Sequence, residues 1–97
     1  MDTYAILRRS GWKSSAELEE AAPRSKAEGD SRDDIEWIRS YILDEGGATL
    51  GSVCIYQAAS EEAIRDHASK AELPVDEVIK IADTVIMRED PAPQQTA

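Results

Sequence analysis

The chain of 97 residues contains one histidine, and acid–base chemistry near neutral pH would fall most naturally to it. His67 lies between Ile64 and Ala71 at helical spacing, so the predicted helix turns its imidazole toward a sheet rather than toward solvent. There the side chain is either a hydrogen-bonded core residue or one that points into a cleft beside Tyr41 or Tyr56. In the second case, the histidine and a tyrosine could bind or protonate an oxygenated ligand.

Cys54 is the single cysteine, and we expect it in mid-strand with Tyr56 on the same face. A lone strand cysteine usually acts as a small buried hydrophobic residue. A nucleophilic thiol would need a base, and His67 is the one imidazole that could serve. The chain has none of the local motifs that accompany catalytic cysteines, and it has no glycine-rich phosphate loop, metal-hydrolase motif or Ser-His-Asp signature.

Two further side chains could contact a ligand. Arg39 lies between two aromatic residues of a predicted strand, where it could form an ion pair at a dimer interface or anchor a carboxylate or phosphate. Trp12, in the loop after the first strand, could cover a pocket or pack under the first helix. We assign no catalytic residue. The predicted ligand-binding residues are His67, Tyr41, Tyr56, Arg39, Trp12 and Cys54.

Charge excludes some classes of partner. The chain carries 20 acidic and 11 basic residues, for a net charge of −9, and its bases form no continuous stripe. Nucleic acids and anionic membranes attract such a stripe, so we expect neither as a partner. No apolar run is long enough to cross a membrane, and the N-terminus lacks the basic start of a signal peptide. With a single cysteine, these features predict a cytoplasmic protein.

The first half of the chain predicts a strand, a helix and a strand. The first strand covers 3–8. A helix should run from Ser15 toward Ala22, because Ser14 followed by Glu17 forms a capping box, and Pro23 should end or kink it. The alternative is a weaker helical continuation through Lys26. Residues 28–34 are polar and predict a loop. Strict alternation in the strand over 34–43 would place its odd-numbered residues, from Ile35 to Leu43, on one face.

The second half predicts a hairpin partner, a helix and a last strand. Residues 44–51 supply turn chemistry, and the strand over 52–58 pairs with the preceding one. Ser60 caps a helix that ends near Ala71. A final extended region follows over 76–86. We predict one domain over 1–88 and a flexible, proline-rich tail over 89–97.

The order β-α-β-β-α-β predicts a ferredoxin-like α+β fold, with a four-stranded antiparallel sheet and two helices on one face. Two helices cover only one face of such a sheet, yet the hairpin carries apolar side chains on both faces. A second copy packed sheet to sheet would bury the other face. We therefore predict a homodimer of the α+β barrel type.

Four stretches carry a family resemblance: 38–42 (Ile-Arg-Ser-Tyr-Ile), 53–58 (Val-Cys-Ile-Tyr-Gln-Ala), 60–68 (Ser-Glu-Glu-Ala-Ile-Arg-Asp-His-Ala) and 73–77 (Leu-Pro-Val-Asp-Glu). From about Tyr4 to Arg88 the chain resembles a bacterial domain family of unknown function, some of whose members are described as nickel-binding proteins. The resemblance implies a dimeric, ferredoxin-like fold.

The nickel property of the family does not transfer directly. Members that look like metal binders carry histidines on the first strand and around the second helix. This chain has Arg8 and Arg9 near the matching strand positions, where they would repel a cation, and it keeps only His67 on the helix. Nickel prefers several nitrogen donors. One route would be a site shared by two protomers, each supplying His67 with a carboxylate such as Asp66.

The favoured function is a small dimeric module that binds a small organic molecule. A divalent metal such as nickel, with His67 as the candidate ligand, comes second. The alternative from another class is an enzyme of the dimeric barrel type, oxygenase-like or isomerase-like, that uses His67. A third is a structural partner that docks another protein through its acidic surface.

Overall fold

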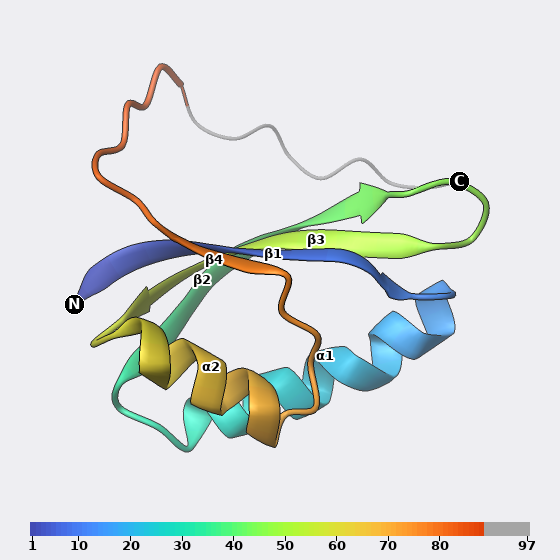
Figure 1. Cartoon of the computed structure of the whole chain (residues 1–97), viewed down its shortest axis with the longest axis horizontal. Helices are drawn as coiled ribbons and strands as arrows, with labels where there is room; N and C mark the ends of the chain where they lie inside the picture. The colour runs from blue at the N-terminus through green and yellow to red at the C-terminus, as the bar shows by residue number, and fades with distance from the viewer. Residues whose placement is uncertain (89–97) are drawn as a thin grey trace.

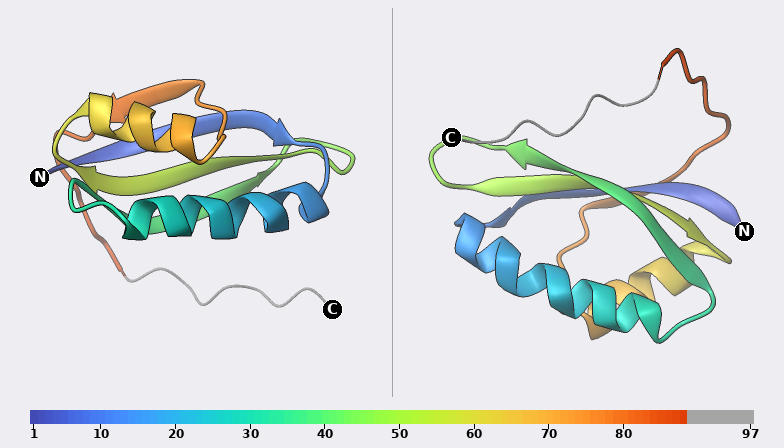
Figure 2. Two further views of the ribbon diagram at one scale, coloured as in Figure 1. Left: turned by 90° about the horizontal axis from the view of Figure 1, so that it is seen from below. Right: turned by 180° about the vertical axis from the view of Figure 1, so that it is seen from behind.

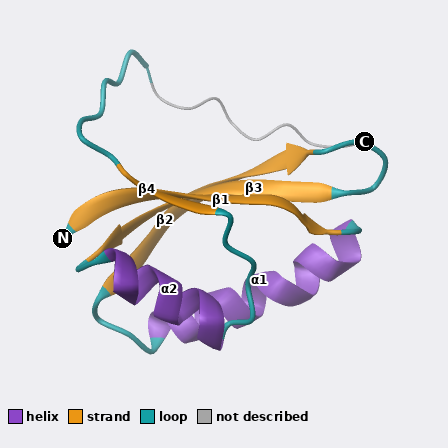
Figure 3. Ribbon diagram, in the orientation of Figure 1, coloured by secondary structure: helices purple, strands orange, loops and turns teal. Residues whose placement is uncertain are grey.

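Four antiparallel strands form one sheet in the order β2-β3-β1-β4, and two helices pack on one face of it (Figures 1 and 3). The computed structural model describes residues 1–88. The elements follow one another as β1 (Asp2–Trp12), α1 (Ser15–Asp30), β2 (Ile35–Asp44), β3 (Leu50–Ala58), α2 (Glu61–Lys70) and β4 (Glu77–Lys80). This is the predicted ferredoxin-like arrangement. The tail predicted over 89–97 lies outside the described residues.

The helices lie side by side across the sheet, as Figure 2 shows: α1 runs along the β2–β3 side and α2 along the β1–β4 side. Both begin at the predicted caps, where Ser14 Oγ accepts from the amide of Glu17 and Ser60 Oγ accepts from the amide of Ala63. The core between helices and sheet contains Tyr4, Ile6, Ile35, Cys54, Tyr56, Ala58, Ala63 and Ile64.

The first helix is longer than predicted. Pro23 does not end it: α1 continues past Lys26, the alternative end, to Asp30, and it includes the first residues of the loop predicted over 28–34. A proline removes one main-chain donor, but tertiary packing on both sides of it can outweigh that loss. Ala21 and Ser25, which flank Pro23, are both buried against the sheet.

Two predicted strand ends were also wrong. β1 does not stop at Arg8 but continues past an irregularity to Trp12, which pairs with Leu50 of β3. Within this irregularity Ser10 has a φ of 50°, a turn-like conformation inside the strand. The last strand is shorter than expected. β4 ends at Lys80, and residues 81–88 form no regular structure.

The predicted alternation along β2 was wrong beyond Trp37. Trp37 pairs with Tyr56, but Arg39 pairs with Ile55, so Ile38 is an extra residue between the two pairs. A bulge of one residue moves every later side chain to the opposite face. Trp37 therefore lies on the helix-covered face with Tyr56. Arg39, Tyr41 and Leu43 lie on the open face.

Candidate functional site

A pocket of about 320 Å³ lies between α1 and the helix-covered face of the sheet. The sheet supplies its floor through alternate residues of three strands, and α1 supplies one wall. The lining residues are Arg8, Trp12, Leu18, Glu19, Ala21, Ala22, Ser25, Trp37, Ser40, Ile42, Ser52, Cys54, Tyr56 and Leu73. Most of these side chains are apolar or aromatic, and such a lining is typical of a site for a small organic molecule.

Arg8 is the one basic residue in this lining. Its side chain points inward because it follows Tyr4 and Ile6 at the alternate positions of β1, and it pairs across the sheet with Ser52. The residue is 1% exposed. Its Nε and Nη2 atoms are buried and have no hydrogen-bond partner. Native proteins rarely leave buried polar groups unpaired, so this guanidinium is a candidate for contact with a ligand.

One wall of the pocket is a stacked aromatic pair. The rings of Trp37 and Tyr56 lie 6.1 Å apart, centre to centre, and are inclined by 10°. Trp37 Nε1 donates to Ser40 Oγ at 2.8 Å, and Ser40 Oγ donates to Cys54 Sγ at 3.0 Å. Ser52 Oγ lies 3.4 Å from the same sulfur. These contacts hold the tryptophan in place and surround the thiol with hydroxyl groups.

Tyr56 and His67 both contact Ser25 of α1. Tyr56 Oη lies 3.3 Å from Ser25 Oγ, and the Nε2–H of His67 donates to the Ser25 carbonyl at 2.9 Å. Burial raises the pKa of Tyr56 above its ordinary value, although the Ser25 hydrogen bond and the charge of Arg8 oppose the shift. Burial also lowers the pKa of His67. The hydrogen bond to the Ser25 carbonyl opposes this shift, and the charge on Arg8 adds to it. Both rings are therefore neutral at pH 7.

The six predicted site residues separate into two groups. Trp12, Cys54 and Tyr56 line the pocket. The other three do not: Arg39 and Tyr41 lie on the open face after the β2 bulge, and His67 packs behind Tyr56, with ring centres 5.7 Å apart. A binding role for any of the six stays a prediction.

Arg8, Trp37 and Ser25 line the pocket but are not among the predicted site residues. From the sequence, Arg8 could face an anionic ligand together with Arg9 and Lys13, but we favoured the alternative that this basic trio balances nearby acidic residues. The signal for Arg8 was present in the sequence. A strand in which Tyr4, Ile6 and Arg8 alternate places a charge in line with two core residues, and that pattern marks a buried cation. Ser25 could not be assigned in this way, because its position depends on the length of α1. Trp37 could not be assigned either, because the sequence does not fix which face of β2 the helices cover.

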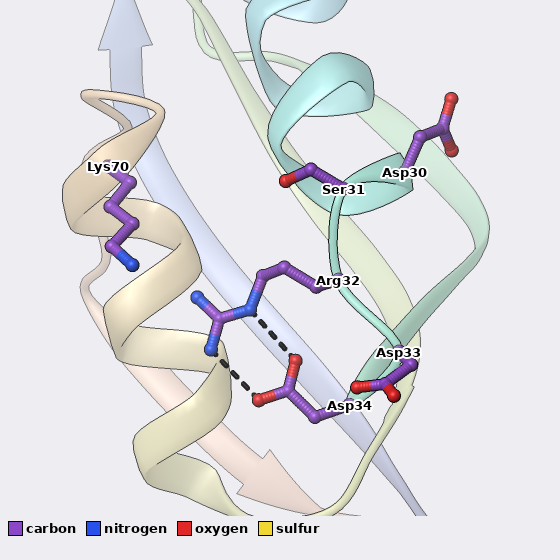
Figure 4. A pocket seen from close by; sticks show the side chains of 6 residues that line it. All are labelled: Asp30, Ser31, Arg32, Asp33, Asp34 and Lys70. Atoms are coloured by element: carbon purple, nitrogen blue, oxygen red, sulfur yellow. Dashed lines mark hydrogen bonds and ion pairs between the residues drawn. The ribbon is translucent and has the colours of Figure 1, made fainter.

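A second hollow, of about 540 Å³, lies where α1 leads into β2 and includes Lys70 of α2 (Figure 4). Arg32 donates from Nε and Nη2 to the two carboxylate oxygens of Asp34, at 2.8 and 2.9 Å, and from Nη1 to Asp66 at 2.7 Å. The guanidinium lowers the pKa of both carboxyls. These charges pair with one another, so the side chains around the hollow form an ion-pair network. This network joins the loop between α1 and β2 to α2.

The profile of the family described as "Nickel responsive protein SCO4226-like" matches residues 4–81. The chain belongs to the SCO4226-like family. This confirms the resemblance seen in the sequence. No curated protein sequence matches the chain.

Two crystal structures share the fold of this SCO4226-like chain. SCO4226 from Streptomyces coelicolor A3(2) is 18% identical, with a TM-score of 0.68 over 86% of this chain and 99% of its own. SnoaB, a cofactor-independent oxygenase from Streptomyces nogalater, is 14% identical, with a TM-score of 0.52 over 92% and 100%. At these identities the likeness supports the fold alone.

Within one copy of this SCO4226-like chain, the described residues do not fit a nickel centre. Within 1–88, no three histidine, cysteine, aspartate or glutamate side chains cluster in a way that could hold a metal ion. His67 is 1% exposed, and its Nε2 is engaged with Ser25. Asp66, its neighbour on α2, is held by Arg32 and Lys70. The pair that we considered for a shared site is therefore already committed to other contacts.

Proposed function

We propose that this SCO4226-like protein is a binding module that holds a small organic molecule in the pocket between α1 and the sheet. The pocket itself carries the proposal: about 320 Å³ of space beside a small core, lined by aromatic and aliphatic side chains from two layers. The alternative of an enzyme that uses His67 has less support, because His67 does not line the pocket and donates its Nε2–H to a main-chain carbonyl.

The chain carries its own reporters for this test. Its two tryptophans, Trp12 and Trp37, both line the pocket, and so does Cys54, its one cysteine. Intrinsic fluorescence and the rate of thiol alkylation therefore both report on occupancy. A panel of small aromatic molecules should change the fluorescence, slow the alkylation and raise the unfolding midpoint of a bound protein.

A variant that fills the pocket supplies the decisive comparison. Ala22→Phe adds a ring on the pocket side of α1, whereas Ala27→Phe adds the same ring at an exposed position of the same helix that does not line the pocket. Binding should be lost in the first variant and kept in the second. Equal responses of the two variants to every molecule, or no response of the wild-type chain to any, would contradict the proposal.

We also propose that two copies pack through the open face of the sheet. Tyr41 is 47% exposed and Ile79 is 45% exposed, and half-buried Leu7, Val53 and Ile55 lie on the same face. Both helices lie on the other face (Figure 2). A second copy would remove this apolar surface from water.

Light scattering at micromolar concentration should give twice the chain mass, and Val53→Lys should reduce it to one chain. A wild-type monomer would rule this out.

The family is described as nickel-responsive, but the possible metal ligands among residues 1–88 do not cluster into a nickel site. Among the described residues, no helix has the length and apolarity needed to cross a membrane. We propose a cytoplasmic location, which the single cysteine of the chain supports, because small secreted domains commonly carry several cysteines paired in disulfides.

A further inference from the structure

Arg8 carries the strongest unexplained feature of the molecule. Its side chain is almost completely buried, and two of its donor atoms, Nε and Nη2, have no partner. The hydroxyl groups of the pocket are directed elsewhere: Ser40 and Ser52 contact the sulfur of Cys54, and Tyr56 contacts Ser25. A buried cation in this state destabilises the fold unless something else supplies acceptors.

Two other arginines of this chain show what those two atoms bind. Arg9 donates from Nε and Nη2 to the two carboxylate oxygens of Glu45, at 2.7 and 3.0 Å. Arg32 donates from the same two atoms to the two oxygens of Asp34, at 2.8 and 2.9 Å. In both cases one edge of the planar guanidinium matches one planar carboxylate. In Arg8 this same edge is unpaired and borders the pocket.

We infer that Arg8 is the receptor for a carboxylate group of the pocket's ligand, an inference that rests on the proposed function. The carboxylate would accept from Nε and Nη2, and the rest of the ligand would lie against the aromatic wall formed by Trp37 and Tyr56. Burial then strengthens the pairing, because no water competes for the donors.

The surroundings narrow the ligand class further. The pocket includes one acidic side chain, Glu19, and the chain has a net charge of −9, so a second negative group on the ligand would be repelled. The remaining lining is mostly apolar. The fitting class is therefore a small monocarboxylic acid with an aromatic or alicyclic ring.

The test compares benzoate with benzamide, which has the same shape without the charge, by tryptophan fluorescence. In the wild-type chain benzoate should bind at least about tenfold more tightly than benzamide. Arg8→Met should abolish this preference, and its unfolding midpoint without ligand should be no lower than that of the wild type, since the unpaired charge is gone. Arg9→Met removes a neighbouring charge that does not line the pocket and should leave the preference intact.

A second measurement needs no variant. Iodoacetate and iodoacetamide alkylate Cys54 by the same displacement of iodide, and only iodoacetate carries a carboxylate. Relative to their rates with glutathione, iodoacetate should be favoured in the native chain, and the preference should disappear in urea.

The outcomes separate the two proposals. Equal binding of benzoate and benzamide, both blocked by Ala22→Phe, overturns the role of Arg8 and leaves the binding module intact. Phenylphosphonate binding as tightly as benzoate overturns the carboxylate assignment. A strongly lowered midpoint for Arg8→Met assigns Arg8 a structural role and also overturns the inference. If no small aromatic molecule of any charge changes fluorescence or alkylation, both proposals fail.

Discussion

The Nε2 atom of His67 on α2 lies 2.9 Å from the main-chain carbonyl oxygen of Ser25 on α1. A carbonyl can only accept, so Nε2 carries the proton. The bond joins the two helices at a buried point, next to the ring of Tyr56. The single histidine therefore acts as a helix-to-helix contact, and its Nε2–H is engaged with a main-chain carbonyl.

The first prediction concerns pH. The pKa of His67 is lowered by burial, with Arg8 and Arg32 acting in the same direction, while the hydrogen bond to the Ser25 carbonyl and the charge of Glu28 oppose the shift. Below the ordinary histidine pKa of about 6.5, His67 binds a proton in the unfolded chain but stays neutral in the folded chain until the pH is lower still. The free energy of unfolding should therefore decrease as the pH falls from 7.5 to 5. Urea titrations across this range measure it.

His67→Gln is the comparison for that pH dependence, because glutamine keeps an N–H donor and does not titrate. Its free energy of unfolding should change less between pH 7.5 and 5 than that of the wild type. The paired carboxyls of Asp34, Asp66 and Glu45 have lowered pKa values, so they act in a more acidic range and do not mimic the effect. Identical slopes for variant and wild type would show that His67 is not the titrating group.

The second prediction concerns Ser25. Ser25→Ala removes the hydroxyl that lies 3.3 Å from Tyr56 Oη but keeps the carbonyl that His67 uses. A buried phenol would lose its partner, so the free energy of unfolding should fall by about 1 to 2 kcal/mol. Adding Tyr56→Phe should recover part of the loss, because both polar groups are then gone. Additive losses in the double variant would show that the two side chains do not interact.

The third prediction concerns Pro23, in the interior of α1. Pro23→Ala restores a main-chain donor and removes the clash of the ring with the preceding turn. We expect stabilisation of about 1 to 3 kcal/mol, measured by urea unfolding. Ala27→Gly, at an exposed position four residues later, should instead destabilise the chain by about 1 kcal/mol. A loss of stability in Pro23→Ala would mean that a bend at the proline is needed for packing.

The fourth prediction concerns Gly51, where β3 passes β1. A Cβ atom there would lie 2.5 Å from the main-chain oxygen of Arg8 and 2.5 Å from Glu45 Oε1. The main-chain oxygen cannot move aside, so Gly51→Ala should destabilise the fold by about 1 to 3 kcal/mol. Ala48→Ser, at an exposed position in the connection between β2 and β3, should change stability little. Thermal unfolding of the two variants measures the difference, and equal midpoints would contradict the predicted clash.

Local signals predicted much of this protein. Ser14 and Ser60 cap the helices because a short hydroxyl side chain reaches the amide three residues later, and nothing distant is needed for that contact. The alternating apolar runs and the turn between them predicted the hairpin, and the order of elements predicted the sheet. The caps and the hairpin depend on residues that are near one another in the chain, and the sheet follows from the order of the elements by a general rule of fold topology. The sequence alone was therefore enough for these features.

The candidate site depended on the tertiary structure. One extra residue at Ile38 moved Arg39 away from the helices and left Trp37 beside Tyr56, and no local pattern marks such a bulge. His67 was predicted to turn inward, and it does so, but the partner that it meets is set by the packing of α2 against α1. The sequence already placed Arg8 in line with core residues. Its two unpaired donors border a pocket only because α1 packs over three strands. The sequence could not show this, because a contact between distant segments has no local signature.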